Sequence, residues 1–203
     1  MNKNKKILIT GSSGFIGFSL ALNLLKKGHK ILGFDSINDY YDIKLKHSRN
    51  KILKKFKNFS FIRGELEDQK KLNKNILSFK PEIIIHLAAQ AGVRYSLDAP
   101  RKYLSSNIIG TFNIIEIAHK IKVKHLLIAS SSSVYGANKQ SAFKETDKTD
   151  TQLSIYAATK NQQKVLLIHI RHFGKYQLPC YVFLLYMVLG ADQIWPISNL
   201  QMQ

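Results

Sequence analysis

A tyrosine and a lysine spaced four residues apart could together perform acid–base chemistry. Tyr156 and Lys160 are separated by Ala-Ala-Thr. Residues four apart share one face of a helix. An ammonium beside a phenol favours the phenolate and lowers a pKa that is about 10 in model peptides. Tyr156 would then act as a base. The alternative for such a pair taken alone is a solvated helix face.

Four consecutive serines, residues 130–133, precede this pair and are followed by Val-Tyr-Gly. They come directly after an apolar run, residues 126–129, that predicts a strand. Ligands of open α/β sheets bind at the carboxyl ends of the strands. The serine run therefore favours an active site over a solvated helix face for Tyr156 and Lys160.

A glycine-rich turn and an acidic residue indicate a dinucleotide site. Gly11, Gly14 and Gly17 lie between a predicted strand, residues 7–10, and a predicted helix, residues 15–27. Glycines there let the backbone approach a pyrophosphate at the helix N-terminus. Asp35 ends the second predicted strand and could accept hydrogen bonds from ribose hydroxyls, which favours NAD over NADP. The alternatives are ordinary turn glycines and a loop-capping aspartate.

Two further segments carry weaker signals. Residues 64–68, Gly-Glu-Leu-Glu-Asp, could touch an adenine, or could be a turn with a helix cap at Asp68. Residues 86–93 contain small side chains that could lie against a dinucleotide, or could simply permit close packing.

Short β-branched runs alternate with longer helical stretches along the chain. The predicted strands are residues 7–10, 30–34, 59–63, 83–87 and 126–129, and the predicted helices include residues 15–27, 68–79 and 100–122. Residues 38–55 read as a loop followed by a helix. Continuous apolar strands are buried on both faces. The pattern predicts an α/β fold with a doubly wound, Rossmann-type parallel sheet.

Composition excludes several classes of protein. The chain has 203 residues, of which 45% are hydrophobic, and one cysteine, Cys180. It can form no internal disulfide, so we expect a reducing, cytoplasmic location. No apolar run is long enough for a membrane helix, and the N-terminus does not read as a signal peptide. The net charge is +18, but lysines are spread along the chain, so we expect no nucleic-acid partner. The histidines show no metal-ligand spacing.

Together these motifs resemble the extended short-chain dehydrogenase/reductase superfamily, which contains nucleotide-sugar epimerases and dehydratases. The resemblance covers residues 7–160. Within that group, residues 38–42, 89–96 and 129–135 are most similar to UDP-glucuronate 4-epimerases. Dehydratases of the superfamily place an Asp-Glu pair where this chain has Ser132 and Ser133. The resemblance thus implies an epimerase rather than a 4,6-dehydratase. Glucuronate and N-acetylhexosamine epimerases share this half, so the sugar stays open.

The resemblance implies a mechanism and residue roles. Tyr156, ionised next to Lys160, takes the proton of the sugar 4-hydroxyl while hydride passes from C4 to NAD⁺. The 4-keto sugar turns over, and hydride returns to its opposite face. Ser131 would hydrogen-bond the reacting oxygen, and Ser132 is the second candidate. Other substrate-binding residues would be Gln90 and Arg94. The implied cofactor-binding residues are Gly11, Gly14, Phe15, Ile16, Gly17, Asp35, Glu65, Leu66, Leu87, Ala88, Ala89, Asn107 and Lys160.

After Lys160 the chain no longer follows this pattern. Relatives continue to a strand reading Arg-Phe-Phe-Thr-Val-Tyr-Gly-Pro-Trp-Gly-Arg-Pro-Asp-Met-Ala. Codons that could encode residues 181–196 can also encode this string in a shifted reading frame, in which the third base of each codon is read with the first two bases of the next codon. Met187 and Val188 must give glycine, and Trp195 and Pro196 must give alanine. We therefore expect residues 1–160 to form an NAD-binding domain and residues 161–203 to be an out-of-frame tail, with the substrate domain missing.

Two consequences follow for activity and assembly. We expect little or no turnover from the chain as it stands, with a UDP-sugar as the substrate of the intact enzyme. Relatives often form homodimers through two helices. Here the second of these helices would begin near Tyr156, and its sequence would depart from the family after Lys160, so we expect this dimer interface to be impaired. An alternative from another class is a non-catalytic NAD-binding module, although such a module has no need of a base.

Overall fold

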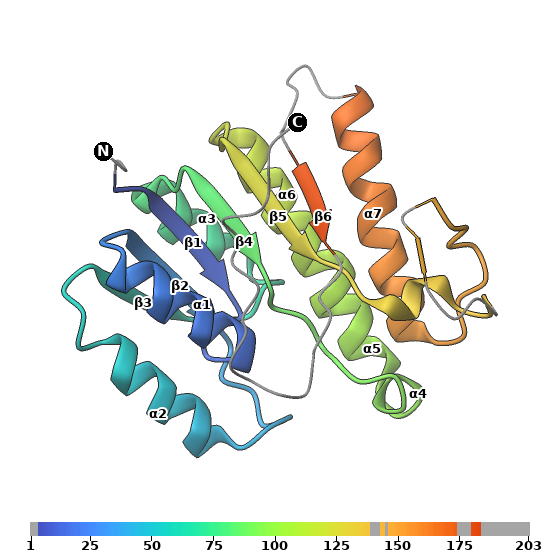
Figure 1. Cartoon of the computed structure of the whole chain (residues 1–203), viewed down its shortest axis with the longest axis horizontal. Coiled ribbons are helices and arrows are strands. Elements are labelled where there is room, and N and C mark those ends of the chain that lie inside the picture. Colours follow the sequence, from blue (N-terminus) through green and yellow to red (C-terminus); the bar gives the residue numbers. More distant parts are fainter. Residues whose placement is uncertain (1–3, 139–142, 145, 174–179, 184–203) are drawn as a thin grey trace.

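The fold is built on a parallel sheet with helices on both faces. A computed structural model describes residues 4–138, 143–144, 146–173 and 180–183 (Figure 1). The strand order is β3-β2-β1-β4-β5-β6, and every neighbouring pair is parallel. The strands are β1 (Lys6–Thr10), β2 (Lys30–Asp35), β3 (Phe59–Arg63), β4 (Ile83–His86), β5 (His125–Ala129) and β6 (Cys180–Phe183). The predicted doubly wound α/β class is confirmed.

Two helices cover one face of the sheet and three cover the other. Helices α1 (Phe15–Lys26) and α2 (Ile43–Leu53) pack on a core that includes Ile7, Ile9 and Ile31. Helices α3 (Gln69–Phe79), α6 (Thr111–Lys120) and α7 (Ile155–Phe173) pack on a core that includes Leu8, Leu32 and Ile84. Side chains alternate between the two faces along each strand. The apolar runs are therefore buried on both sides, as their sequence predicts.

The predicted helix over residues 100–122 is interrupted. A short helix, α4 (Tyr95–Asp98), comes first, then α5 (Pro100–Tyr103), the π-helical turn η1 (Leu104–Gly110) and α6. Inside η1 the Asn107 side chain accepts a hydrogen bond from Gln90 N at 2.8 Å and donates one to Gln90 O at 3.1 Å. The wide π-helical turn thus contains the residue that bonds the loop after β4, at Gln90. Such turns occur often at functional sites.

The sheet order reverses beside β1, because the chain proceeds outward from β1 through β2 to β3 and then restarts at β4. Ligands in sheets of this kind bind in the crevice at that switch point. The carboxyl ends of β1, β2, β4 and β5 therefore lie along one edge (Figure 1). Strand β6 adds to the far side of β5, where Ala129 pairs with Phe183.

Candidate functional site

The glycine-rich turn between β1 and α1 is closely packed. Gly11 has φ +72°, and a Cβ atom there would lie 2.8 Å from the Ala88 nitrogen. A Cβ atom on Gly17 would lie 2.1 Å from the Gly11 oxygen. Gly14 caps α1 without any side-chain hydrogen bond, and Gly14 N donates to Gly11 O at 3.1 Å. Helix α1 has no acidic residue in its first turn, so its amino end can accept an anion.

The residues that follow the first two glycines lie beside this turn. The Phe15 ring is 57% exposed, and the Arg49 guanidinium lies 5.9 Å from its centroid. Ile16 is half-buried. Both residues lie in the first turn of α1, at the carboxyl edge of the sheet.

Asp35 holds the turn against the end of β2. Its carboxylate accepts hydrogen bonds from Ser13 N and from Ile37 N, both at 2.9 Å, and the side chain is 8% exposed. The Asn50 amide donates to Ser13 Oγ at 2.9 Å. A carboxylate has about four lone-pair sites, so acceptor capacity remains for ribose hydroxyls. Asp35 is thus both a structural clamp and a candidate cofactor contact.

The segment after β4 borders the same turn, and the segment after β3 adjoins the end of β2, where Gly64 N donates to Asp35 O at 3.1 Å. Leu87 and Ala88 lie against Gly11, and Ala88 N donates to Thr10 Oγ1 at 3.2 Å. Leu66 is 4% exposed and packs on Gly110. Partial burial, together with the carboxylates of Glu67 and Asp35, raises the pKa of Glu65. Asp68 caps α3 by accepting from Lys71 N, so the turn-plus-cap interpretation of this segment is correct.

Tyr156 and Ser131 are brought together at the end of β5. Burial raises the pKa of the Tyr156 phenol, and a hydrogen bond with Ser131 acts in the opposite direction. Ser131 Oγ also accepts from Ser133 N at 3.2 Å. Ser132 begins the 3-10 turn η2 (Ser132–Tyr135) and is exposed. The serine run thus supplies one direct partner for the phenol.

Lys160 lies deeper in the protein than the acid–base argument assumed. It is 5% exposed, and its ammonium donates to Ala129 O at 2.9 Å and to Gln163 Oε1 at 3.4 Å. Burial lowers the pKa of Lys160 to about 8. The expected lowering of the Tyr156 pKa is therefore wrong for this state of the protein. Desolvation of the phenol outweighs the favourable contacts, and the described hydrogen bonds of Lys160 go to other groups.

Asn107 connects the loop after β4 with helix α7, which carries Tyr156 and Lys160. Besides its two bonds to Gln90, the Asn107 amide donates to Thr159 Oγ1 at 3.1 Å. Gln90 is 5% exposed and donates to Ala91 O at 3.4 Å. Ala89 is half-buried, and Arg94 is exposed at the start of α4. Of the proposed substrate residues, Gln90 is therefore fixed by the fold, whereas Arg94 and Ser132 face outward.

Sequence reasoning missed two buried groups near the site. Tyr103 is fully buried and donates to Ala91 O and Gly92 O at 2.7 and 2.6 Å, and its ring centroid lies 6.2 Å from that of Tyr156. His86 bridges Thr10 Oγ1 at 2.7 Å and Thr111 Oγ1 at 3.0 Å. Both contacts span distant parts of the chain. The position of His86 at the end of a buried strand could have indicated a buried imidazole, whereas no sequence pattern around Tyr103 indicates its burial.

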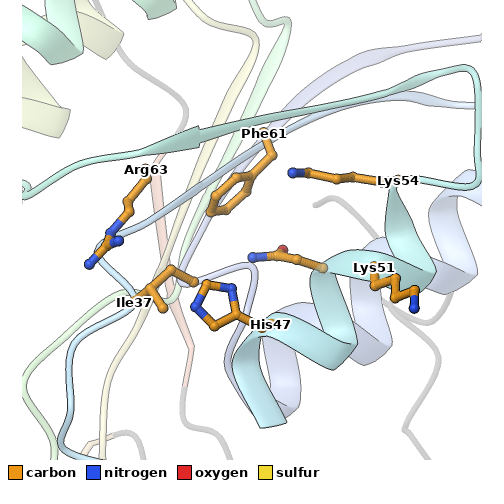
Figure 2. Close-up of a pocket in the computed structure, with 7 residues that line it drawn as sticks. Ile37, His47, Lys51, Lys54, Phe61 and Arg63 are labelled. Atoms are coloured by element: carbon orange, nitrogen blue, oxygen red, sulfur yellow. The ribbon is translucent and has the colours of Figure 1, made fainter. Parts of the chain in front are cut away.

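A basic hollow of about 550 Å³ lies between α2 and β3, and Ser131, Tyr156 and Lys160 are not among its lining residues (Figure 2). Ile37, Phe61 and Arg63 line it from the sheet side, and His47, Asn50, Lys51 and Lys54 line it from α2. The Lys54 ammonium lies 5.8 Å from the centroid of the Phe61 ring. One lining residue, Ile37, comes two positions after Asp35 in the sequence. The hollow therefore lies near the Asp35 end of the site rather than the Tyr156 end.

In the described part of the chain, no group of three His, Cys, Asp or Glu residues could hold a metal ion. Within the same residues, no helix is both long and apolar enough to cross a membrane.

Comparison with known proteins gives consistent matches. The family described as GDP-mannose 4,6 dehydratase matches residues 8–193. A probable UDP-glucuronate 4-epimerase of Rhizobium meliloti is 43% identical over 91% of this chain and 54% of its own length. A UDP-glucuronate 4-epimerase of Thermodesulfobacterium geofontis is 43% identical over 81% of this chain and 51% of its own length. The chain thus spans about half the length of these curated relatives.

Solved structures agree with this fold. The crystal structure of a Bacillus cereus UDP-glucuronic acid 4-epimerase, in complex with UDP-glucuronic acid and NAD, has a TM-score of 0.77 and 31% identity. The match covers 87% of this chain and 55% of that one. A UDP-glucose 4-epimerase from Brucella ovis, in complex with NAD, has a TM-score of 0.76 at 23% identity, which bears on the fold alone.

Proposed function

The chain belongs to the GDP-mannose 4,6 dehydratase family of extended short-chain dehydrogenase/reductases, and we propose that it carries the cofactor-binding half of an NAD-dependent UDP-glucuronate 4-epimerase. The observation that carries the proposal is the meeting of Tyr156 with Ser131 at the sheet edge that also holds Asp35 and the glycine-rich turn. The two relatives described above are epimerases. Ser132 and Ser133 stand where the resemblance would place the acidic pair of a dehydratase, so no acid for eliminating water is present at these two positions.

The residues at this edge fit a dinucleotide. A Cβ atom on Gly11 or Gly17 would collide with backbone, so the turn stays narrow and its amides stay accessible. Asp35 retains acceptor capacity for the ribose hydroxyls of an adenosine, and its charge would repel a 2′-phosphate. When bound, NAD⁺ would supply the acceptor for the C4 hydride. We propose further cofactor contacts from residues around this sheet edge, which are Phe15, Ile16, Glu65, Leu66, Leu87, Ala88, Ala89 and Asn107.

The chain's own residues would handle the proton. Tyr156 would take the proton of the sugar 4-hydroxyl and return it when the opposite epimer forms. Ser131 would hydrogen-bond the same oxygen and hold it against the phenol. Burial raises the pKa of the Tyr156 phenol in this structure, and we assign to the positive charge of Lys160 the role of favouring the phenolate once the substrate is bound. The pKa of Lys160, about 8, keeps its ammonium mostly charged at neutral pH. Because the hydride is returned to the sugar, the proposed reaction is redox-neutral.

The substrate would be a UDP-sugar held beyond the cofactor. We assign Gln90, Arg94 and Ser132 to its binding, with Ser131 and Tyr156 at the reacting carbon. Arg94 is an exposed cation at the entrance after β4, a suitable partner for the anionic groups of such a substrate. We propose UDP-glucuronate rather than another UDP-sugar as the substrate, because the relatives that are more than 40% identical include proteins named as UDP-glucuronate 4-epimerases.

We further propose that the NAD-binding domain ends near Lys160 and that residues 161–203 are read out of frame. The family match continues to residue 193, and α7 continues to Phe173. Neither observation reports codons, so the nucleotide sequence is the test. Codons that spell the family string in the displaced frame would support the slip. Codons that do not spell it would refute the slip.

The activity is tested by restoring that frame and assaying the product for UDP-galacturonate formed from UDP-glucuronate. We expect turnover from the restored enzyme, none from its Tyr156→Phe variant, and little or none from the present chain. Epimerisation of UDP-N-acetylglucosamine alone would contradict the assigned sugar. A restored protein that binds NAD⁺ tightly but epimerises no UDP-sugar would favour the non-catalytic module instead.

A further inference from the structure

The segment between β2 and α2, residues 36–42, reaches across the carboxyl edge of the sheet. The Tyr40 hydroxyl rests on Gly92 after β4, where an added Cβ atom would lie 2.1 Å from its oxygen. The Tyr40 ring centroid lies 5.1 Å from that of Tyr95, at the start of α4. Strand β1 lies between β2 and β4. The segment therefore extends past the end of β1, where the glycine-rich turn begins.

This segment is fixed at several points. Lys46 is 6% exposed, and its ammonium donates to Asn38 O at 2.8 Å and to Asn38 Oδ1 at 2.7 Å. Ile37 has φ +54° although it is β-branched, and its side chain is 2% exposed. Such a backbone conformation persists only when the surroundings determine it strongly. Asp42 then caps α2 by accepting from Lys44 N at 2.8 Å. The position of Tyr40 is thus set from both sides.

On its other side, Tyr40 faces the catalytic phenol through a row of aromatic rings. The centroids of Tyr95 and Tyr103 are 6.3 Å apart, and those of Tyr103 and Tyr156 are 6.2 Å apart. Tyr40 therefore lies between Asp35, at the proposed ribose end of the site, and Tyr156, at the reacting end.

We propose that Tyr40 is a cofactor-retaining residue that covers the stretch of the sheet edge between Asp35 and Tyr156. The inference rests on the proposed function, because it assumes a dinucleotide that runs from Asp35 past the glycine-rich turn to Tyr156. A ligand of that length must pass the place that Tyr40 spans. Its release then requires Tyr40 to leave Tyr95 and Gly92. A redox-neutral epimerase needs this retention, since the same nicotinamide must accept and return the hydride.

Lys46 is assigned a positioning role in the same device. It is held in helix α2 and binds the Asn38 backbone and side chain, two residues before Tyr40. Loss of its ammonium would release the segment without removing any aromatic ring. The neighbouring Leu45 provides the contrast, because it lies beside Lys46 in α2 and is 46% exposed.

The test is the dissociation rate of NADH, measured by stopped-flow fluorescence when excess NAD⁺ displaces it from the full chain. We expect Tyr40→Ala to raise this rate about tenfold, equivalent to about 1.4 kcal/mol, a typical contribution of an aromatic contact. Tyr40→Phe should stay within about twofold of the unaltered protein, since it keeps the ring. Lys46→Met should raise the rate with all rings present. Leu45→Ala, at an exposed position on the same helix as Lys46, is the matched control and should leave the rate unchanged.

Circular dichroism establishes that each variant is folded, and Lys46→Met tests the proposal even if Tyr40→Ala does not fold. Equal rates for the unaltered protein, Tyr40→Ala and Lys46→Met would overturn the proposal. A Leu45→Ala rate equal to that of Tyr40→Ala would overturn it as well. Failure of the unaltered protein to bind NADH would refute the proposed cofactor site itself, and with it the role of Tyr40. The two failures are therefore distinguishable.

Discussion

The buried imidazole of His86 makes the stability of the protein depend on pH. It lies at the end of β4 and bridges Thr10, the residue before the glycine-rich turn, to Thr111 at the start of α6. Burial, and secondarily the charge of Lys160, lowers the pKa of His86 from 6.5 to about 3. We predict that His86→Gln flattens the loss of stability in mild acid, because glutamine can form hydrogen bonds at this position but does not titrate.

The sign and size follow from proton linkage. Below pH 6.5 the unfolded chain protonates this histidine, whereas the native protein takes up the proton only near pH 3. Stability therefore falls as the pH falls through this window. With these two values, the contribution of His86 between pH 7 and pH 5 is about 2 kcal/mol of lost unfolding free energy. Burial also lowers the pKa of His29, which adds a loss of the same sign in both proteins and cancels in the comparison.

Urea unfolding at pH 7 and pH 5, followed by circular dichroism, measures the difference directly. His86→Gln is expected to be less stable at pH 7, because the bridge between the two threonines is altered. Its further loss on acidification should be about 2 kcal/mol smaller than that of the unaltered protein. His47→Gln, which removes an exposed imidazole from α2, is the matched control. Parallel pH dependences for the unaltered protein and His86→Gln would refute this account of the buried imidazole.

Three further predictions concern the site. Gly17→Ala should destabilise the fold by about 1–3 kcal/mol in urea unfolding, because its methyl group would overlap the Gly11 carbonyl, and Ser19→Ala on the same helix should not. Asn107→Ala should lower the melting temperature, since it leaves buried Gln90 backbone groups unpaired at about 1–3 kcal/mol each; a melting temperature equal to that of the unaltered protein would count against the role of Asn107. Asp35→Asn should weaken NADH binding and narrow the preference for NADH over NADPH in fluorescence titrations, whereas an unchanged preference would remove Asp35 from the ribose site.

The strands could be predicted because the signal for each was local. A parallel strand buried on both faces needs a short, continuous apolar run, and residues 7–10, 59–63 and 83–87 supply it directly. The observed strands begin or end within one residue of these bounds. Asp68 was recognised as a cap because the capping bond is made to a residue three positions away. Helix 100–122 was not correctly predicted, because the π turn accompanies contacts between Asn107 and Gln90, and no local pattern reports that pairing.

In the candidate site too, features with a local sequence signal could be predicted, whereas features that depend on contacts between distant residues could not. Gly11, Asp35, Ser131 and Tyr156 were recognisable because each stands at a fixed place relative to a strand or helix. The ionisation of Tyr156 could not be read from spacing, since it depends on how deeply the fold buries the phenol and where Lys160 finds its acceptors. Tyr40 was noted only as part of a family-like segment. Its contact with Gly92 joins residues that are distant in sequence, and only the fold reveals it.

The central claim is that this sheet edge binds NAD beside Tyr156, and calorimetric titration of the folded chain with NAD⁺ tests it most directly. The account predicts saturable binding of one NAD⁺ per chain, weakened in Asp35→Asn. Absence of any binding heat from correctly folded protein, at more than one temperature, would contradict it.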